Sequence, residues 1–177
     1  MNHAARILLE RIQAEGAING EVIKVDRFLN HQVDPRLMEL LGAELAGRFA
    51  DQAIDKILTA ETSGIMLAQA IALCLKLPFV YAKKKPPRTM GAFYSAASYS
   101  FTKQESTTLY VSREVLGAGE RVLFVDDFFA TGSTFKAIEE ILAQAGAVLV
   151  GTAVIINKSE RRDVEAILTL EELQRNV

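Results

Sequence analysis

The sequence predicts one α/β domain of 177 residues with a doubly wound, mainly parallel sheet. Two observations carry this prediction. Short apolar segments, such as 54–60, 79–82 and 147–156, alternate with segments of helical spacing, which is typical of a parallel sheet covered by helices. Residues 122–134 contain the same order in one unit: an apolar strand, a small polar turn and the start of a helix. We therefore expect ligands beyond the carboxyl ends of the strands.

Composition narrows the class of protein. Half of the residues are hydrophobic, and the net charge of −2 gives no basis for nucleic-acid binding or for attraction to an acidic membrane surface. The single cysteine, Cys74, rules out a disulfide framework. No signal-peptide pattern is present, and no apolar run approaches the roughly 18 residues that span a bilayer. We expect a cytoplasmic protein with neither nucleic-acid nor membrane partners.

The first third of the chain is predicted to contain two helices. Apolar periodicity indicates a helix over 3–15, and alternation over 21–26 indicates a short strand outside the main sheet. Residues 28–35 read as an irregular connection. A second helix is expected from Pro35 to about Ala50, because Asp34 is a good N-cap and proline suits the first helical position.

The segment 54–75 forms the first expected strand–turn–helix unit. An apolar strand over 54–60 is followed by Glu61-Thr62-Ser63-Gly64 and then by a strongly apolar helix over 65–75. A small turn before a helix can offer backbone N–H groups to an anion. The next strand is expected at 79–82.

Four cations follow within six residues, in Lys83-Lys84-Lys85-Pro86-Pro87-Arg88. A charge run of this kind is usually a solvated loop, and the two prolines forbid regular structure. Residues 89–106 lack a clear period and are rich in serine, alanine and aromatic residues, so we expect either disorder or a lid. A strand is expected again at 107–112.

The thirteen residues 122–134 hold the strongest candidate site. Asp126 and Asp127 stand where the apolar strand is expected to end, and Ala130-Thr131-Gly132-Ser133-Thr134 precede a helix that runs to about Ala145. The turn suits a phosphate, although the nucleoside-triphosphate loop motif is absent. Carboxylates next to a phosphate suit the hydroxyls of a sugar that carries it. The alternative is that the two aspartates only cap a turn.

The rest of the chain is expected to add two strands. An apolar strand over 147–156 ends at Asn157-Lys158-Ser159, and charged residues lead to a short strand over 164–170. Residues 171–177 read as a polar tail. The candidate sites, including Lys158, all follow predicted strands, which favours one active site at one edge of the sheet.

The stretch 122–134 resembles the signature of the type I phosphoribosyltransferases, which bind phosphoribosyl pyrophosphate (PRPP). Residues 24–35, 61–65 and 98–104 extend this resemblance to the bacterial xanthine phosphoribosyltransferases. The resemblance implies the type I fold in a single domain, 1–177. It also implies a core over 35–158, a small hood over about 16–34 and 159–177, and a flexible lid loop over about 86–106.

The resemblance implies transfer of the 5-phosphoribosyl group from PRPP to a purine, most simply xanthine, with release of pyrophosphate. Two alternatives stay open: an adenine or other 6-oxopurine phosphoribosyltransferase, or a PRPP-sensing regulator without catalysis. A homodimer is implied, with Lys84 able to act across its interface. Mg²⁺ is implied as the cofactor, held mainly through PRPP and water.

The resemblance also assigns roles to individual residues. Asp126, Asp127 and Lys84 are the expected catalytic residues. PRPP-binding residues are those of the two turns: Glu61, Thr62, Ser63, Gly64, Ala130, Thr131, Gly132, Ser133 and Thr134. The purine is expected to contact Ile23, Asn30 and Lys158, and a cis peptide is expected at Glu61–Thr62.

Two features of the sequence bear on the choice of base. Position 130 is alanine, where hypoxanthine–guanine enzymes usually carry an acid, so no general base is evident. One hypothesis is that xanthine reacts as its anion, which Lys158 would favour. A helix that normally follows Lys158 in the family is missing, which leaves purine preference less defined than PRPP binding.

Overall fold

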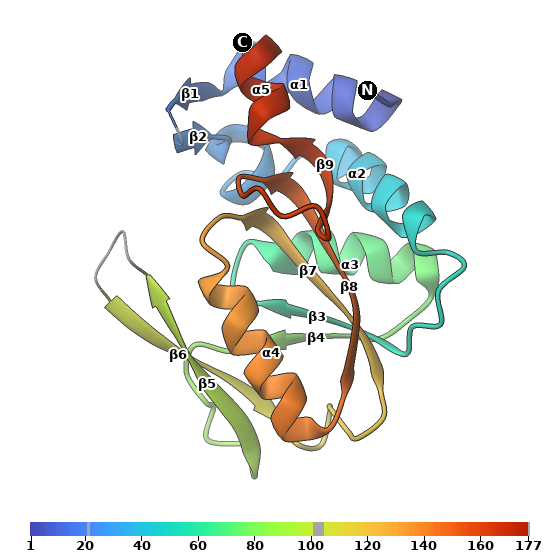
Figure 1. The fold of residues 1–177 in the computed structure, drawn as a ribbon, viewed down its shortest axis with the longest axis vertical. Coiled ribbons are helices and arrows are strands. Elements are labelled where there is room, and N and C mark those ends of the chain that lie inside the picture. Colours follow the sequence, from blue (N-terminus) through green and yellow to red (C-terminus); the bar gives the residue numbers. More distant parts are fainter. Residues whose placement is uncertain (21, 101–104, 177) are drawn as a thin grey trace.

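The computed structural model describes residues 1–20, 22–100 and 105–176, and a parallel sheet lies at its centre (Figure 1). The sheet has the strand order β4-β3-β7-β8-β9. Its strands are β3 (Lys56–Ala60), β4 (Phe79–Ala82), β7 (Arg121–Phe129), β8 (Val148–Asn157) and β9 (Glu165–Thr169). All four neighbouring pairs are parallel, which confirms the predicted fold class.

Helices cover both faces of this sheet. They are α1 (His3–Glu15), α2 (Pro35–Arg48), α3 (Gly64–Leu75), α4 (Ser133–Ala145) and the short α5 (Leu170–Asn176). The predicted N-cap of α2 is confirmed, because the Asp34 carboxylate accepts from the N–H groups of Arg36 and Leu37 at 3.0 and 3.2 Å. These bonds hold the pKa of Asp34 below its ordinary value.

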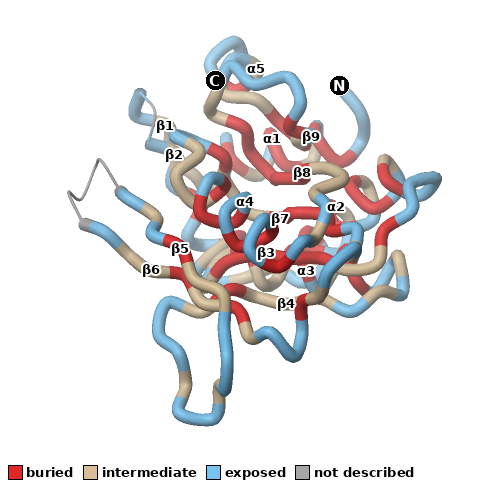
Figure 2. The backbone as a smooth tube through the Cα atoms, turned by 60° about the horizontal axis from the view of Figure 1, so that its bottom comes forward, coloured by how far each residue is buried: buried red, intermediate tan, exposed pale blue. Residues whose placement is uncertain are grey.

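Two hydrophobic clusters occupy the two faces of the sheet. One joins α1, α2 and α3 to residues such as Ile57, Val125 and Ile155. The other joins α4 to Leu58, Phe124 and neighbouring residues. Figure 2 shows the buried residues gathered in the strands and the inward sides of the helices, with the connecting loops exposed. The carboxyl ends of the strands are therefore held rigidly by packing on both sides.

Two antiparallel hairpins lie outside the main sheet. The first pairs β1 (Ala17–Asn19) with β2 (Val22–Lys24), so the predicted strand near 21–26 is confirmed, but its partner β1 was not expected. The second pairs β5 (Phe93–Ser100) with β6 (Glu105–Ser112).

The β5–β6 hairpin corrects the prediction that 89–106 is irregular. Residues 93–100 form a strand that packs beside α4 (Figure 1). The side chain of Gln144 binds the backbone of Ser95 twice, with its amide nitrogen donating at 2.8 Å and its oxygen accepting at 3.2 Å. These residues form a strand because they pair with β6 along their length and pack beside α4, and periodicity could not reveal the contact with α4. Residues 101–104 of the predicted lid lie outside the described residues.

Three smaller expectations are also corrected. The acid pair Asp126–Asp127 lies within β7, which continues to Phe129, because β8 pairs with it as far as Asn157. Part of the connection expected at 28–35 is a π-helical turn, η1 (Asp26–Asn30), with the buried side chains of Phe28 and Leu29. The predicted polar tail contains α5, which buries Leu173.

The region predicted as the hood gathers at one end of the molecule (Figure 1). It contains the β1–β2 hairpin, η1, β9 and α5, and α1 lies there as well, since the Gln13 side chain donates to the backbone carbonyl of Asn176. Between β8 and β9 the chain has no helix, only a turn over 158–164. The missing helix inferred from the sequence is thus also missing from the structure, and the domain boundaries stay predictions.

Two glycines of α2 offer a test of the α2–α3 packing. A Cβ at Gly42 would lie 2.5 Å from the Ala70 Cβ of α3, whereas nothing lies within 4 Å of one at Gly47. We expect Gly42→Ala to lower the free energy of unfolding by about 1–3 kcal/mol through overpacking. The matched variant Gly47→Ala is expected to raise it by up to about 1 kcal/mol through helix propensity. Urea unfolding measures both, and equal effects would contradict this packing.

Candidate active site

The candidate site lies where the strand order of the sheet diverges. The crossover from β3 leads through α3 to β4 on one side, whereas the crossover from β7 leads through α4 to β8 on the other. The turns after β3 and β7 therefore lead apart and leave a crevice at the carboxyl ends of two adjacent strands. Glu61–Gly64 follow β3, and Ala130–Thr134 follow β7.

Three cavities with shared walls extend along this crevice. A cavity of about 170 Å³ is lined by the turn after β7, and it shares Ser98, Asp126, Phe128 and Thr134 with a second one of about 360 Å³. The second cavity shares Ser63 and Lys84 with a third, of about 500 Å³, which reaches the hood. Residues from separate parts of the sequence thus form one continuous surface.

The acid pair lies at the centre of these cavities. Asp126 and Asp127 both line the 360 Å³ cavity, and Asp126 also lines the smallest one. Each carboxylate accepts a hydrogen bond from the next backbone N–H: Asp126 from Asp127 at 2.9 Å, and Asp127 from Phe128 at 3.0 Å. The backbone of β7 therefore fixes both side chains and leaves further carboxylate lone pairs for a ligand.

The surroundings of Asp126 disfavour the charged form of its carboxyl group. Burial raises the pKa of Asp126 well above its ordinary value, and the adjacent Asp127 raises it further. The Lys84 ammonium acts in the opposite direction. A ligand that brings hydrogen-bond donors or cations to Asp126 would remove the cost of this buried charge. A pKa displaced by these causes inside a cavity is typical of functional sites.

The turn after β7 provides an anion site built from backbone. Gly132 is the N-cap of α4 with φ of 75°, a left-handed conformation that glycine adopts without strain. The first N–H groups of α4 have no partner within the helix, and Gly132 has no side chain that could cap them. These donors and the helix dipole favour a phosphate group.

The β5–β6 hairpin contacts this turn directly. The Ser133 hydroxyl donates to the backbone carbonyl of Tyr99, and the two hydroxyls of Ser133 and Ser98 lie 3.0 Å apart. Because Ser133 uses its proton on Tyr99, Ser98 is the donor in the second bond. The hairpin therefore forms one wall of the 170 Å³ cavity, in the place where the sequence predicts a lid.

The turn after β3 faces the acid pair from the neighbouring strand. Its Glu61–Thr62 peptide bond is cis, as the resemblance implies. The Glu61 carboxylate accepts from the backbone N–H of Lys84 at 2.8 Å, which ties the turn after β3 to the segment after β4. Thr62 and Ser63 line the 500 Å³ cavity, and Ser63 also lines the 360 Å³ cavity.

Gly64 begins α3 at a position where no side chain fits. A Cβ there would lie 2.2 Å from the Thr59 hydroxyl oxygen and 2.8 Å from a carboxylate oxygen of Asp126. Thr59 is fully buried, and its hydroxyl has no hydrogen-bond partner among the described residues. The close approach of α3 to the acid pair is what brings the two turns to one site.

Lys84 of the same chain lies between the two larger cavities. It lines both of them and acts on Asp126 electrostatically. The sequence left open whether this lysine acts within its own chain or across an interface. The structure brings the side chain to the acid pair of its own chain.

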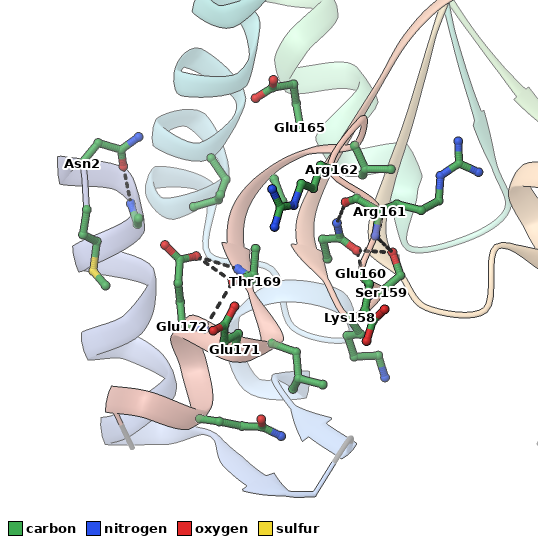
Figure 3. Close-up of a pocket in the computed structure, with 18 of the residues that line it drawn as sticks. Asn2, Lys158, Ser159, Glu160, Arg161, Arg162, Glu165, Thr169, Glu171 and Glu172 are labelled. Carbon is green, nitrogen blue, oxygen red and sulfur yellow. Dashed lines mark hydrogen bonds between the residues drawn. The ribbon is translucent and has the colours of Figure 1, made fainter.

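The residues expected to contact the purine are not brought into one cavity. Asn30, the last residue of η1, lines the 500 Å³ cavity with Asp26 and His31. Ile23 of β2 is half-buried and lines none of the three cavities. Lys158 follows β8 and lines a separate hollow of about 1,190 Å³ (Figure 3).

Phe128 connects Lys158 to the crevice, and sequence reasoning missed it. The Lys158 ammonium lies 5.6 Å from the centre of the Phe128 ring, and Phe128 lines the two cavities around Asp126. An aromatic ring at this place offers a stacking surface for a planar ligand. Its position directly after the acid pair was the available signal. Ser98 and Tyr99 lie in the segment 98–104 that carries part of the resemblance, although the sequence alone assigns them no individual role.

Comparison with known proteins agrees with this geometry. A family model for the phosphoribosyl transferase domain matches residues 30–172. The xanthine phosphoribosyltransferase of Heliobacterium modesticaldum is 46% identical over 161 residues, which cover 90% of this chain and 86% of that protein. That of Moorella thermoacetica is 47% identical over 163 residues, with 91% and 83% covered.

Solved structures match the fold at low sequence identity. The adenine phosphoribosyltransferase of Rhodothermus marinus superposes with a TM-score of 0.72 at 24% identity, covering 96% of this chain and all of that one. The enzyme of Giardia lamblia, solved with 9-deazaadenine, gives 0.74 at 18% identity, with 91% and 97% covered. On the strength of the family model, the curated relatives and this fold, the chain belongs to the phosphoribosyltransferase family.

Proposed function

We propose that this enzyme transfers the 5-phosphoribosyl group from PRPP to xanthine, giving xanthosine 5′-monophosphate and pyrophosphate. The observation that carries the proposal is the row of three cavities with shared walls. Backbone N–H groups border one end, the acid pair the middle, and Lys84 with the turn after β3 the other end. This order suits a phosphate, a ribose and a pyrophosphate joined in one molecule.

Each part of PRPP has a partner of suitable chemistry. The N–H groups around Ala130–Thr134 suit the 5′-phosphate, and the hydroxyls of Thr131 and Thr134 add donors. Asp126 and Asp127 suit the two ribose hydroxyls, since ionised carboxylates only accept hydrogen bonds. Glu61–Gly64 would bind pyrophosphate through backbone groups, and Lys84 would add positive charge where negative charge develops on the leaving group.

The reaction then requires positioning more than covalent help. A purine nitrogen attacks C1′ of PRPP, the bond from C1′ to the pyrophosphate oxygen breaks, and the electron pair leaves with pyrophosphate. Holding the base and C1′ in line supplies much of the rate enhancement. The β5–β6 hairpin beside Ser133 would limit access of water, which could otherwise hydrolyse PRPP.

Mg²⁺ is the proposed cofactor, and the donor set suits an ion that arrives with PRPP. The Asp126 carboxylate offers oxygen ligands inside the crevice. No group of three or more His, Cys, Asp or Glu side chains that could hold a metal occurs within residues 1–20, 22–100 and 105–176. Mg²⁺ commonly takes its other ligands from phosphates and water, and it would supply charge to the pyrophosphate oxygens.

The choice of xanthine rests on the base end of the site. Lys158 beside Phe128 supports binding of an oxygen-rich or anionic purine, because a lysine ammonium donates hydrogen bonds and cannot accept them. Asn30 and Ile23 are the proposed further contacts from the hood. The adenine enzymes among the structural neighbours share the fold at identities that do not transfer their substrate.

Homodimer formation and cytoplasmic location stay predictions. An apolar groove of about 430 Å³ between α2 and α3, lined by residues such as Met66 and the exposed Leu73, is a surface that a second copy would cover in such a dimer. Across the described part of the chain, none of the helices combines the length and apolar character needed to cross a bilayer. Sedimentation at several protein concentrations measures the oligomeric state.

A purine panel tests the proposed function. With PRPP and Mg²⁺, we expect kcat/KM for xanthine to exceed that for adenine roughly 100-fold or more, because a site that donates hydrogen bonds to the base oxygens rejects a base without matching acceptors. Guanine and hypoxanthine complete the panel, and ultraviolet absorbance follows the reaction. Turnover of none of the four bases would favour the PRPP-sensing regulator, and preference for adenine would contradict the xanthine assignment.

Replacement of Asp126 tests the ribose role and its pH dependence. Because the pKa of Asp126 is raised in the folded protein, that state holds the proton more tightly than the unfolded chain does. The wild type should therefore lose stability as pH rises through the raised pKa, and PRPP affinity should fall as pH drops through it. We expect Asp126→Asn to remove both dependences, to raise Tm at pH 8 and to weaken PRPP binding about tenfold or more.

Calorimetry of PRPP binding at pH 6, 7 and 8 provides the measurement for Asp126. The phosphates of PRPP titrate as well, so only the difference between wild type and Asp126→Asn reports on this carboxyl. An Asn variant that binds PRPP as tightly as the wild type at pH 8 would contradict the ribose assignment.

Replacement of Lys158 tests the anion hypothesis for xanthine. A nearby ammonium favours the anion, so its removal should move the rate profile for xanthine to higher pH and raise the xanthine KM about tenfold. Lys76 is an exposed cation at the C-terminal end of α3. Lys76→Ala is therefore the matched control and should leave the profile unchanged. An unaltered profile in Lys158→Ala would show that the hypothesis is wrong.

A further inference from the structure

The turn that carries Lys158 is closed by one buried side chain. Asn157, the last residue of β8, is only 2% exposed. Its amide nitrogen donates to the carbonyl oxygen of Arg161 at 2.8 Å. Its amide oxygen accepts from the N–H and the hydroxyl of Ser159, at 2.9 and 2.8 Å. Lys158 therefore lies between Asn157 and Ser159, the two residues that these bonds join, and Figure 3 shows it beside Ser159.

The backbone of this turn is anchored on further sides. The N–H of Lys158 donates to the carbonyl oxygen of Phe129 at 2.7 Å, and the Ser159 hydroxyl accepts from the N–H of Arg161 at 3.2 Å. Asn157 itself pairs with Phe129 in β7 and with Thr169 in β9. The Arg161 guanidinium lies 4.7 Å from the centre of the Phe135 ring, at the start of α4.

A lysine side chain depends on such an anchor. Lysine has high rotamer freedom, so an ordered position of its ammonium requires a fixed backbone and favourable contacts along the stem. The ammonium of Lys158 contacts the Phe128 ring, and Phe128 lines the cavities around the acid pair. With no helix between β8 and β9, the turn over 158–161 supplies the local order.

We propose that Asn157 is a positioning residue for the purine, which acts by fixing Lys158 rather than by contact with a substrate. The inference rests on the proposed function, because it needs Lys158 to contact the base. The side chain of Asn157 uses its oxygen and one N–H within the turn, and Asn157 lines none of the three cavities of the crevice. Asn157 is buried in the wall of the hollow that Lys158 also lines, so we expect its effect to pass through the turn to Lys158.

Kinetics of Asn157→Ala separate this role from general loss of structure. We expect the xanthine KM to rise about tenfold, equivalent to about 1.4 kcal/mol, with the PRPP KM within about twofold of wild type. A purely structural role would instead change both constants or lower only the amount of active enzyme. Equal increases in both KM values would overturn the proposal.

A double-mutant cycle shows whether Asn157 acts through Lys158. If it does, the Asn157→Ala/Lys158→Ala variant should have the xanthine KM of Lys158→Ala alone, because the two losses are one interaction. Additive losses would mean that Asn157 acts by another route and would contradict the inference.

Two further variants keep the test decisive. Ser159→Ala removes one partner of the Asn157 oxygen at a less buried position, and it should raise the xanthine KM in the same direction by a smaller factor even if Asn157→Ala folds poorly. Asn176→Ala, an exposed asparagine of α5, is the matched control and should match the wild type. An unchanged xanthine KM in Ser159→Ala would overturn the proposal.

Different results would contradict the positioning role of Asn157 and the proposed transferase function. Absence of turnover by the wild-type protein with any purine would remove the proposed function. A wild type that uses xanthine, together with a Lys158→Ala variant of raised KM and an Asn157→Ala variant of normal KM, would remove only the role of Asn157.

Discussion

The structure depends on placing two carboxylates beside an anion site without letting them repel its ligand. Asp126 and Asp127 lie on β7, a few residues before the turn that lines the 170 Å³ cavity. The helix dipole of α4 and the Lys84 ammonium offset the negative charge from two directions. Burial and, after it, the charge of Asp127 outweigh this offset and raise the pKa of Asp126. Hydroxyls and cations that arrive with a ligand complete the offset.

The strand order of the sheet makes this arrangement possible. Because β3 and β7 are neighbours whose crossovers leave in opposite directions, α3 and α4 begin on either side of the acid pair. Gly64 then allows α3 to approach Asp126 to a distance that any side chain would prevent. The lack of space for a side chain at Gly64 thus decides whether the two turns can hold one ligand between them.

The sequence was sufficient where a local pattern determines the structure. The apolar strands, the N-cap Asp34 and the helix after Gly132 follow from residue type and spacing. It was insufficient where a contact distant in the sequence contributes: β5 pairs with β6 but also packs beside α4, whose Gln144 binds the backbone of Ser95. α5 likewise forms where Leu173 is buried in the core. The three cavities could not be predicted, since their walls come from segments far apart in the chain.

The two ends of the site differ in how they are built. The phosphate end relies mainly on backbone N–H groups at a helix start, which persist after substitution by any residue except proline. The base end relies on one flexible cation, Lys158, on a turn that a single amide closes. Substitutions can therefore alter the base end while the phosphate end persists. We therefore expect substitutions at the base end to change which purine is preferred while PRPP is still used.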